Sequence, residues 1–285
     1  EDGSTIHKLL GYSPEKNAFE YNADNPLMVD VVILDEVSMV GGGLFLDLLL
    51  AMPSGSKLIM IGDPGQLESI GLCNIIQDVQ TSRVIPHVRL TQIFRQAAMS
   101  GIITASIKIY HQQPILPNGF VGHVTHGELN DFDITVCTTP EECWSVALQT
   151  YKTLISSPDC TPEDIAVCVA KRCIGQLSAA LLNAEIQKLF NRTGAFLTKN
   201  YTDNGYKYTV NYYVGDRVLV TKNNYSAQTI DGAKEAVFNG NLGTVIDVDT
   251  DEGQLIVRFP QGDIIIYDSE LENLQLGYAI TTHKV

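Results

Sequence analysis

The chain has 285 residues, 45% of them hydrophobic, and carries 33 acidic against 19 basic residues, a formal net charge of −14. This length predicts more than one domain. The excess of acid argues against a protein that coats nucleic acid through a basic surface, although it leaves open a narrow strand-binding channel.

The sequence contains no run of about 18 apolar residues and no charged-then-apolar signal peptide, so we expect no membrane partner. None of the six cysteines belongs to a Cys-x-x-Cys pair or to a cluster with zinc-finger spacing. This pattern predicts reduced thiols in a cytoplasmic protein, without a cysteine-based metal site.

The first predicted element is a short helical turn over 5–12, which begins at a Thr5 cap and ends at a glycine. Residues 13–26 are rich in Ser, Pro, Asn and Asp around Phe19 and Tyr21. This composition predicts a loop, or a small hairpin with an aromatic tip that projects from the sheet.

Two hydrophobic strands then end in polar residues. The apolar residues 31–34 predict a strand buried on both faces of a parallel sheet, followed by Asp35 and Glu36. A second strand over 57–61 is followed by a turn that holds Gln66. Open α/β sheets place ligands at the carboxyl ends of their strands. Two adjacent acids at that edge therefore predict a site for a cation or a reacting water.

Helices accompany these strands. Residues 44–50 are nearly all apolar and predict a buried helix that completes a βαβ unit. Residues 84–96 predict a short strand followed by polar groups that include Arg95. The next helix, over 98–111, is expected to turn its isoleucines toward a core.

The second half of the chain changes once, from alternating helices and strands to short strands. Helix 140–156, strand 164–169 and helix 175–190 alternate, which predicts a second doubly wound α/β domain. From Tyr206 the pattern becomes short strands separated by Gly- and Asn-rich turns, which predicts a small β-barrel. The apolar stretch 274–282 then returns as a buried strand, so the barrel is expected to be an insertion.

Seven stretches stand in order along the chain: 5–11, 34–39, 62–67, 90–97, 223–225, 238–243 and 276–284. In this order and at these intervals they resemble motifs of the RecD-like superfamily 1B DNA helicases, the exodeoxyribonuclease V alpha-subunit family. The resemblance covers essentially the whole chain.

The resemblance implies an α/β fold of two RecA-like, P-loop-type domains, the first incomplete, with a small Src-homology-3-type β-barrel inserted in the second. The first domain would cover 1–90 and carry a strand-separating hairpin over 12–27. The second would cover 91–205 plus 270–285, and the barrel 206–269.

The resemblance also implies an ATP-dependent helicase or translocase that moves 5′ to 3′ along single-stranded DNA in recombination or repair, with ATP and Mg²⁺ as cofactors. Asp35 would hold Mg²⁺ through water, and Glu36 would orient or deprotonate the attacking water. Gln66 would sense the γ-phosphate. Arg95 would act as an arginine finger on transition-state charge.

For DNA, the resemblance implies polar side chains that hydrogen-bond the strand without a large positive surface. These residues are Thr5, His7, Asn224, Tyr225, Asn239, Thr282 and His283. Phe19 or Tyr21 would stack on the end base pair of a duplex junction. An ordinary exposed loop, or ordinary turn-forming residues in the barrel, would give the same sequence pattern.

The sequence departs from the family pattern in two places. It contains no Gly-x-x-x-x-Gly-Lys-Ser/Thr phosphate loop, and it stops inside the last motif. We therefore expect a piece of a longer helicase that is inactive by itself, whose parent works alone or with nuclease-complex subunits. The alternatives are the helicase module of a conjugative relaxase and a non-catalytic DNA-binding subunit. The intact Asp35, Glu36, Gln66 and Arg95 argue against the second alternative.

Overall fold

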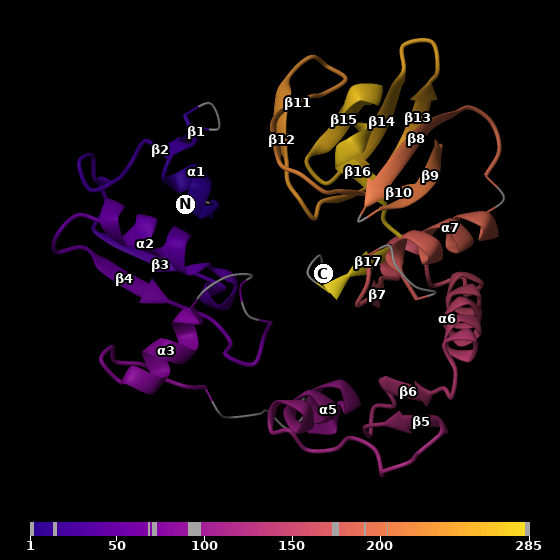
Figure 1. Cartoon of the computed structure of the whole chain (residues 1–285), viewed down its shortest axis with the longest axis horizontal. Helices are drawn as coiled ribbons and strands as arrows, with labels where there is room; N and C mark the ends of the chain where they lie inside the picture. The colour runs from indigo at the N-terminus through magenta and orange to yellow at the C-terminus, as the bar shows by residue number, and fades with distance from the viewer. Residues whose placement is uncertain are drawn as a thin grey trace. The chain divides into compact units, whose positions relative to one another are not determined.

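The computed structural model divides the chain into two compact units, which are described separately (Figure 1). Unit 1 contains Glu1–Pro117 and Thr125–Phe132, and unit 2 contains Asn118–Val124 and Asp133–Val285. The structure describes residues 3–13, 16–67, 69, 73–90, 98–172, 177–190, 192–203 and 205–282. Each unit has its own cluster of buried apolar side chains.

A pair of parallel strands forms the centre of unit 1. β3 (Val31–Leu34) pairs with β4 (Lys57–Met60), and α2 (Gly42–Ala51) connects them. The predicted βαβ unit is therefore confirmed. A 3₁₀ helix, η1 (Val37–Met39), follows β3, and α3 (Ile75–Ser82) follows β4.

Only one face of this strand pair is buried. Val32 and Leu34 lie in the core of unit 1, whereas Val31 and Ile33 are 45% and 64% exposed. The prediction of a strand buried on both faces is therefore wrong for the described residues. Successive side chains of a strand point to opposite faces, and the core cluster of unit 1 lies against one of them.

The helix α2 is likewise buried along one stripe instead of all around. Leu48 and Ala51 are buried, but Leu46, Leu49 and Leu50 are exposed. The prediction of a buried helix is wrong for that face. Apolar composition alone does not indicate how many sides of a helix have neighbours.

The first elements of unit 1 agree with the sequence. α1 (Ile6–Leu9) begins at Thr5, whose Oγ1 accepts a hydrogen bond from the Lys8 N–H at 3.2 Å. β1 (Tyr12–Ser13) and β2 (Ala18–Phe19) form an antiparallel hairpin. The helical turn and the small hairpin are confirmed.

The end of unit 1 agrees less well. α5 (Gly101–Tyr110) lies within the predicted helix 98–111. However, Ile102, Ile103 and Ile109 are exposed, and the buried residues of α5 are Gly101 and Ala105. The expected orientation is therefore wrong for these three isoleucines. No strand forms over 84–90, and the rest of that predicted segment, 91–97, lies outside the described residues.

The α/β part of unit 2 follows a two-stranded sheet of β5 (Gly122–His126) and β6 (Phe132–Val136). α6 (Pro140–Ile155) confirms the helix predicted over 140–156. After η2 (Pro162–Asp164), β7 (Val167–Val169) and α7 (Ala179–Leu189) confirm the next strand and helix. At the end of the chain, β17 (Ala279–Thr281) pairs in parallel with β7 (Figure 1).

Between α7 and β17 the chain is almost entirely β. The main sheet has five strands in the order β15-β14-β13-β10-β16, all antiparallel to their neighbours. Its strands are β10 (Arg217–Val220), β13 (Leu242–Asp249), β14 (Gln254–Phe259), β15 (Gly262–Tyr267) and β16 (Leu274–Leu276). The 3₁₀ helix η3 (Asp268–Asn273) leads into β16.

Two antiparallel pairs complete this part: β8 (Phe196–Asp203) with β9 (Tyr206–Tyr213), and β11 (Asn224–Gln228) with β12 (Lys234–Val237). The strand β8 was not predicted. Its half-buried positions include Lys199 and Asp203 as well as Leu197 and Tyr201, so no apolar alternation marks it in the sequence.

The architecture is therefore a mixed α/β fold with small, open sheets, and the predicted α/β class is confirmed. The division into 1–90, 91–205 plus 270–285, and 206–269 stays a prediction. Among the described residues, no helix combines the length and the apolar character needed to cross a bilayer.

Candidate functional site

The parallel pairing of β3 and β4 brings the two predicted polar strand ends together in unit 1. The Ile61 N–H donates to the Leu34 carbonyl at 2.8 Å, and the Val37 N–H donates to the Ile61 carbonyl at 3.0 Å. Asp35 and Glu36 therefore leave the sheet beside the turn that follows β4. Asp35, Glu36 and Gln66 are all exposed at this edge.

Backbone geometry holds the two acids in a tight turn. Glu36 has φ 52° and ψ 42°, the left-handed conformation that side chains other than glycine seldom adopt. The Glu36 N–H donates to Asp35 Oδ1 at 2.9 Å. Such conformations cost about 1–3 kcal/mol and are concentrated at functional sites. Both Asp35 and Glu36 are exposed in this turn.

The turn after β4 is fixed by close packing. A Cβ on Gly62 would lie 2.8 Å from Val37 Cγ1 and 2.9 Å from Ile76 Cδ1, so only glycine fits there without a shift of its neighbours. Asp63 Oδ1 accepts the Gly65 N–H at 2.8 Å, and the Asp63 carbonyl accepts the Gln66 N–H at 3.1 Å. These contacts position Gln66 one turn beyond the strand.

Three residues beside this turn were not predicted as site residues. Asp63 shapes the turn itself. The Tyr110 ring lies over Gly65, where an added Cβ would be 2.8 Å from Tyr110 Cδ2. The Arg89 guanidinium donates to the Tyr110 hydroxyl at 3.0 Å, with its carbon 5.5 Å from the ring centroid. Asp63 lies within the motif-like stretch 62–67, but its place beside Arg89 and Tyr110 is visible only in the folded chain.

This edge of the sheet presents carboxylate oxygens but not a complete set of protein ligands for a metal ion. Among the described residues, no group of three or more His, Cys, Asp or Glu side chains is arranged to hold an ion. That arrangement fits Mg²⁺, which proteins usually bind through one or two carboxylates while substrate phosphates and water supply the other ligands. It does not fit a structural zinc site, which needs about four protein ligands.

The predicted DNA contacts of the first segment also lie in unit 1. The His7 ring packs against Tyr12 and Phe19, with ring centroids 5.3 Å and 5.6 Å apart. Phe19 and Tyr21 are half-buried against the core of this unit, instead of projecting at the hairpin tip. Thr5 is exposed, although its Oγ1 already caps α1.

The predicted barrel contacts gather around one corner of unit 2. Tyr225 is exposed and meets Phe238 edge-on, with ring centroids 5.9 Å apart. Asn223 joins this corner through both ends of its amide, donating to the Tyr225 hydroxyl at 3.1 Å and accepting the Asn239 N–H at 2.7 Å. Asn224 instead donates to Glu270 Oε1 at 3.1 Å, a contact within the fold.

The remaining predicted residues lie near the chain end or outside the described part. Thr282 is exposed directly after β17. Arg95 and His283 lie outside the described residues. The structure thus assembles Asp35, Glu36 and Gln66 at one edge, while the predicted DNA contacts are divided between the two units.

A buried charged cluster in unit 2 was not predicted from sequence. Asp216 has no exposed surface and accepts hydrogen bonds from four donors. These donors are the Tyr278 hydroxyl (2.9 Å), Arg192 Nε (3.3 Å), Gln187 Nε2 (2.5 Å) and the Tyr213 N–H (2.9 Å). Burial raises the pKa of Asp216 above its ordinary value, and the donors oppose that shift.

Comparisons with known proteins agree with this geometry. Residues 1–72 match the family described as "AAA domain", and residues 182–259 match "ATP-dependent RecD-like DNA helicase SH3 domain". The second match covers most of the predicted barrel, so the expected Src-homology-3-type domain is confirmed.

Several relatives align with nearly the whole chain. The ATP-dependent RecD2 DNA helicase of Deinococcus radiodurans is 30% identical over 99% of this chain and 34% of its own length. The RecBCD enzyme subunit RecD of Mycolicibacterium smegmatis is 24% identical over 99% of this chain and 47% of its own length. The crystal structure of Pif1 helicase from Candida albicans aligns at a TM-score of 0.49 and 16% identity, over 99% of this chain and 72% of that one. The chain therefore spans between a third and a half of these two sequence relatives.

Proposed function

Because this chain belongs to the RecD-like helicase family, we propose that it is the central part of an ATP-dependent DNA helicase. The observation that carries the proposal is the shared edge of β3 and β4. Asp35 and Glu36 leave one strand there, and the turn with Gln66 leaves the other. This is the position at which open α/β sheets bind and transform ligands.

At this edge each side chain would have a separate task. ATP with Mg²⁺ would supply the bond to be broken and the positive charge beside it. Asp35 would hold the ion through water, and Glu36 would accept the proton of the attacking water. Gln66 would hydrogen-bond the γ-phosphate from its fixed turn. Arg95 keeps its proposed role as the arginine finger.

The substrate proposed for the whole protein is single-stranded DNA at a duplex junction, followed in the 5′ to 3′ direction. Thr5, His7 and Thr282 would contact phosphates through hydroxyl and imidazole groups, which suits a chain of net charge −14. Phe19 and Tyr21 would act at the junction from the base of the hairpin. Association with nuclease-complex subunits is included because one relative is named as a RecBCD enzyme subunit. A cytoplasmic location is part of the same proposal.

The test is ATP hydrolysis by the full-length protein that contains this chain, with and without single-stranded DNA. We expect DNA to stimulate the wild type, and Glu36→Gln to lower turnover by about 10²–10⁴-fold with ATP binding retained. Asp78→Asn is the matched control, because Asp78 is an exposed acid of α3 in the same unit. It should turn over ATP as the wild type does.

Two results would count against the proposal. Full turnover by Glu36→Gln would remove Glu36 from the water-activating role. A wild type whose hydrolysis ignores DNA, and which opens neither a 5′-tailed nor a 3′-tailed duplex, would overturn the helicase assignment. Opening of the 3′-tailed substrate alone would reverse the proposed direction.

A further inference from the structure

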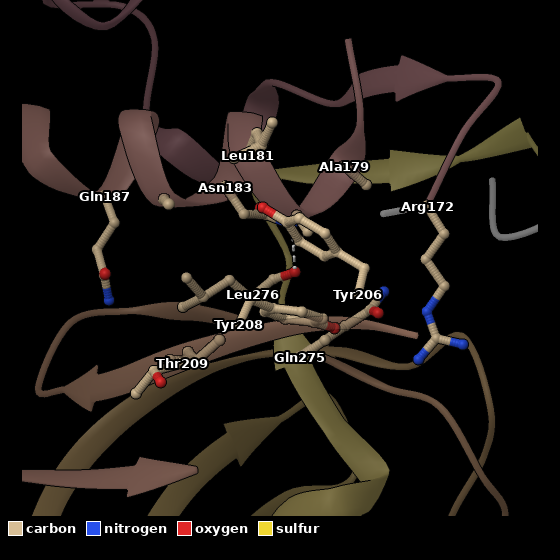
Figure 2. A pocket seen from close by; sticks show the side chains of 13 residues that line it. Arg172, Ala179, Leu181, Asn183, Gln187, Tyr206, Tyr208, Thr209, Gln275 and Leu276 are labelled. Atoms are coloured by element: carbon tan, nitrogen blue, oxygen red, sulfur yellow. Dashed lines mark hydrogen bonds between the residues drawn. The ribbon is translucent and has the colours of Figure 1, made fainter. Parts of the chain in front are cut away.

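Unit 2 contains a pocket whose lining includes none of the predicted nucleotide or DNA contacts. It lies between α7 and β9, and its wall includes Arg172, Ala184, Gln187, Tyr206, Tyr208 and Leu276. Figure 2 shows the Tyr206 and Tyr208 rings beneath α7, with Arg172 on one side and Gln187 on the other. None of these residues was predicted from the sequence as a site residue.

One wall of the pocket is a stack of tyrosine rings. Tyr208 stacks on Tyr201 at a centroid distance of 5.2 Å and an interplanar angle of 16°, and on Tyr206 at 6.0 Å and 29°. The inner ring is anchored, since the Tyr201 hydroxyl donates to the Leu271 carbonyl at 2.6 Å. The outer ring, Tyr206, is 36% exposed. A stack that is fixed inside and open outside provides a platform for another flat ring.

The opposite wall is formed by α7 and includes small residues. Ala180 and Ala184 of α7 line it and leave room next to the rings. Asn183 ties α7 to the end of the chain, donating to the Leu276 carbonyl at 2.9 Å and accepting the Ala279 N–H at 2.7 Å. Gln187 Nε2 donates to Asp216 Oδ2 at 2.5 Å. The pocket is therefore preformed, which lowers the entropic cost of binding.

The positively charged side chain of Arg172 lies at one side of the pocket (Figure 2). The Arg172 side chain is 52% exposed, and its Nε lies 3.4 Å from an Asp203 carboxylate oxygen. A half-exposed ion pair at that distance is weak and easily rearranged. The guanidinium has five N–H donors, so it can contact an additional anion such as a phosphate.

From this combination we infer that the pocket binds one nucleobase, stacked on the outer ring, Tyr206, with its phosphate at Arg172. The inference rests on the proposed function and adds to it a base-binding site on the barrel side of unit 2. Stacking on aromatic rings tolerates any base and needs little positive surface, which suits the acidic chain. The same chemistry is offered by a free nucleotide and by a base within a strand.

The test uses the 285-residue chain and a fluorescein-labelled 15-mer of deoxythymidine, with binding followed by fluorescence anisotropy. Tyr206→Ala should weaken binding by about ten-fold, in the range measured for the loss of one base–aromatic stack. Arg172→Gln should weaken it by a smaller factor and reduce its salt dependence. Leu181→Trp, which fills the pocket from α7, should weaken it as much as Tyr206→Ala does.

The matched control is Phe196→Ala. Phe196 is an exposed aromatic residue of the same hairpin, paired with Tyr213 at 5.0 Å, and it does not line the pocket. Its removal should leave the affinity unchanged. Melting temperatures of all four variants show whether each one is folded, so that a loss of binding is not mistaken for unfolding.

A second readout locates the base directly. The same oligonucleotide with 5-iodouracil, irradiated in the complex, should cross-link to the peptide that carries Tyr206 and Tyr208. Competition by thymidine monophosphate at micromolar concentration would assign the pocket to free nucleotides, and competition by oligonucleotide alone would assign it to a strand.

The inference is overturned if Tyr206→Ala and Leu181→Trp bind the oligonucleotide as the wild type does and the cross-links map elsewhere. That result would leave the proposed helicase function intact, because DNA-stimulated ATP hydrolysis of the full-length protein is measured separately. Conversely, base binding at Tyr206 without such hydrolysis would retain the pocket and remove the helicase assignment.

Discussion

At the scale of single residues, Asp216 is a fully buried acid that connects several segments of unit 2. Its two oxygens accept hydrogen bonds from a backbone N–H, an amide, a guanidinium and a hydroxyl. Gln187 belongs to α7 and Arg192 to the segment after it. Tyr213 is the last residue of β9, and Tyr278 directly precedes β17. One carboxylate therefore links α7 and the end of β9 to the residue that precedes β17, the strand paired with β7.

We predict that Asp216→Asn lowers the free energy of unfolding by about 3–5 kcal/mol, the cost of breaking a buried ion pair. Either orientation of the new amide points an N–H₂ group at donors, which leaves buried hydrogen-bonding groups unpaired. Urea unfolding of the chain measures the effect.

Asp251→Asn, at an exposed turn position after β13, is the control and should change stability by less than about 0.5 kcal/mol. Equal effects of the two substitutions would show that the hydrogen bonds of Asp216 do not stabilise the fold.

At the scale of secondary-structure elements, α5 begins at an acid supplied by another segment. Asp131 accepts the Ser100 hydroxyl at 2.6 Å and the Gly101 N–H at 2.7 Å. The Ser100 hydroxyl is the main cause that lowers the pKa of Asp131 below its ordinary 3.8. The ionised carboxylate therefore stabilises the start of this helix.

A lowered pKa in the folded state gives a definite pH dependence. The stabilisation by Asp131 is present above its unfolded pKa and is lost as pH falls through the lower folded value. We predict that Asp131→Asn unfolds more easily than the wild type near neutral pH, and that the difference narrows as the pH falls below the ordinary pKa of 3.8. Ser100→Ala should remove part of the same dependence. Urea unfolding at a series of pH values measures this, and a difference that does not change with pH would contradict it.

The strand β3 gives a second prediction at this scale. Val32→Ala should lower the free energy of unfolding by about 1–2.5 kcal/mol, because it empties space in a packed core. Val31→Ala, the adjacent residue on the exposed face, should change it by less than about 0.5 kcal/mol. Equal losses would mean that both faces of the strand are covered in solution. The comparison requires only urea unfolding of the two variants.

At the scale of the whole molecule, the buried apolar residues form two clusters with no shared member, one in each unit. We predict two unfolding transitions in a calorimetric scan. Val32→Ala should lower the transition temperature of unit 1 only. Gly243→Ala should lower the other, because an added Cβ would lie 2.7 Å from the Arg258 carbonyl oxygen and 2.7 Å from the Phe259 ring. Such overpacking costs about 1–3 kcal/mol.

A single transition moved by both substitutions would contradict this division. It would show that the two clusters unfold together, as one cooperative core does. The two variants therefore control for each other, since each reports on the cluster that the other leaves unchanged.

Much of the fold could be predicted because its signals are local. The cap at Thr5, the apolar strand of β3 and the helix α6 depend on residues a few positions apart. Side-chain burial could not be predicted equally well. The same apolar pattern in β3, α2 and α5 is consistent with one covered face or two, and the number of neighbours is a property of the folded chain.

The sequence by itself determined that Asp35, Glu36 and Gln66 follow two parallel strands, because the apolar pattern of a strand and the polar residues at its end are consecutive in the chain. Only the tertiary structure decided which distant residues meet. Tyr278 and Asp216 are 62 positions apart, and Asn183 and Ala279 are 96 apart. The Asp216 cluster and the Tyr206 pocket form only because residues 275–278, late in the chain, pack near α7. Hydrogen bonds of this kind depend on distances in space, which no local periodicity encodes.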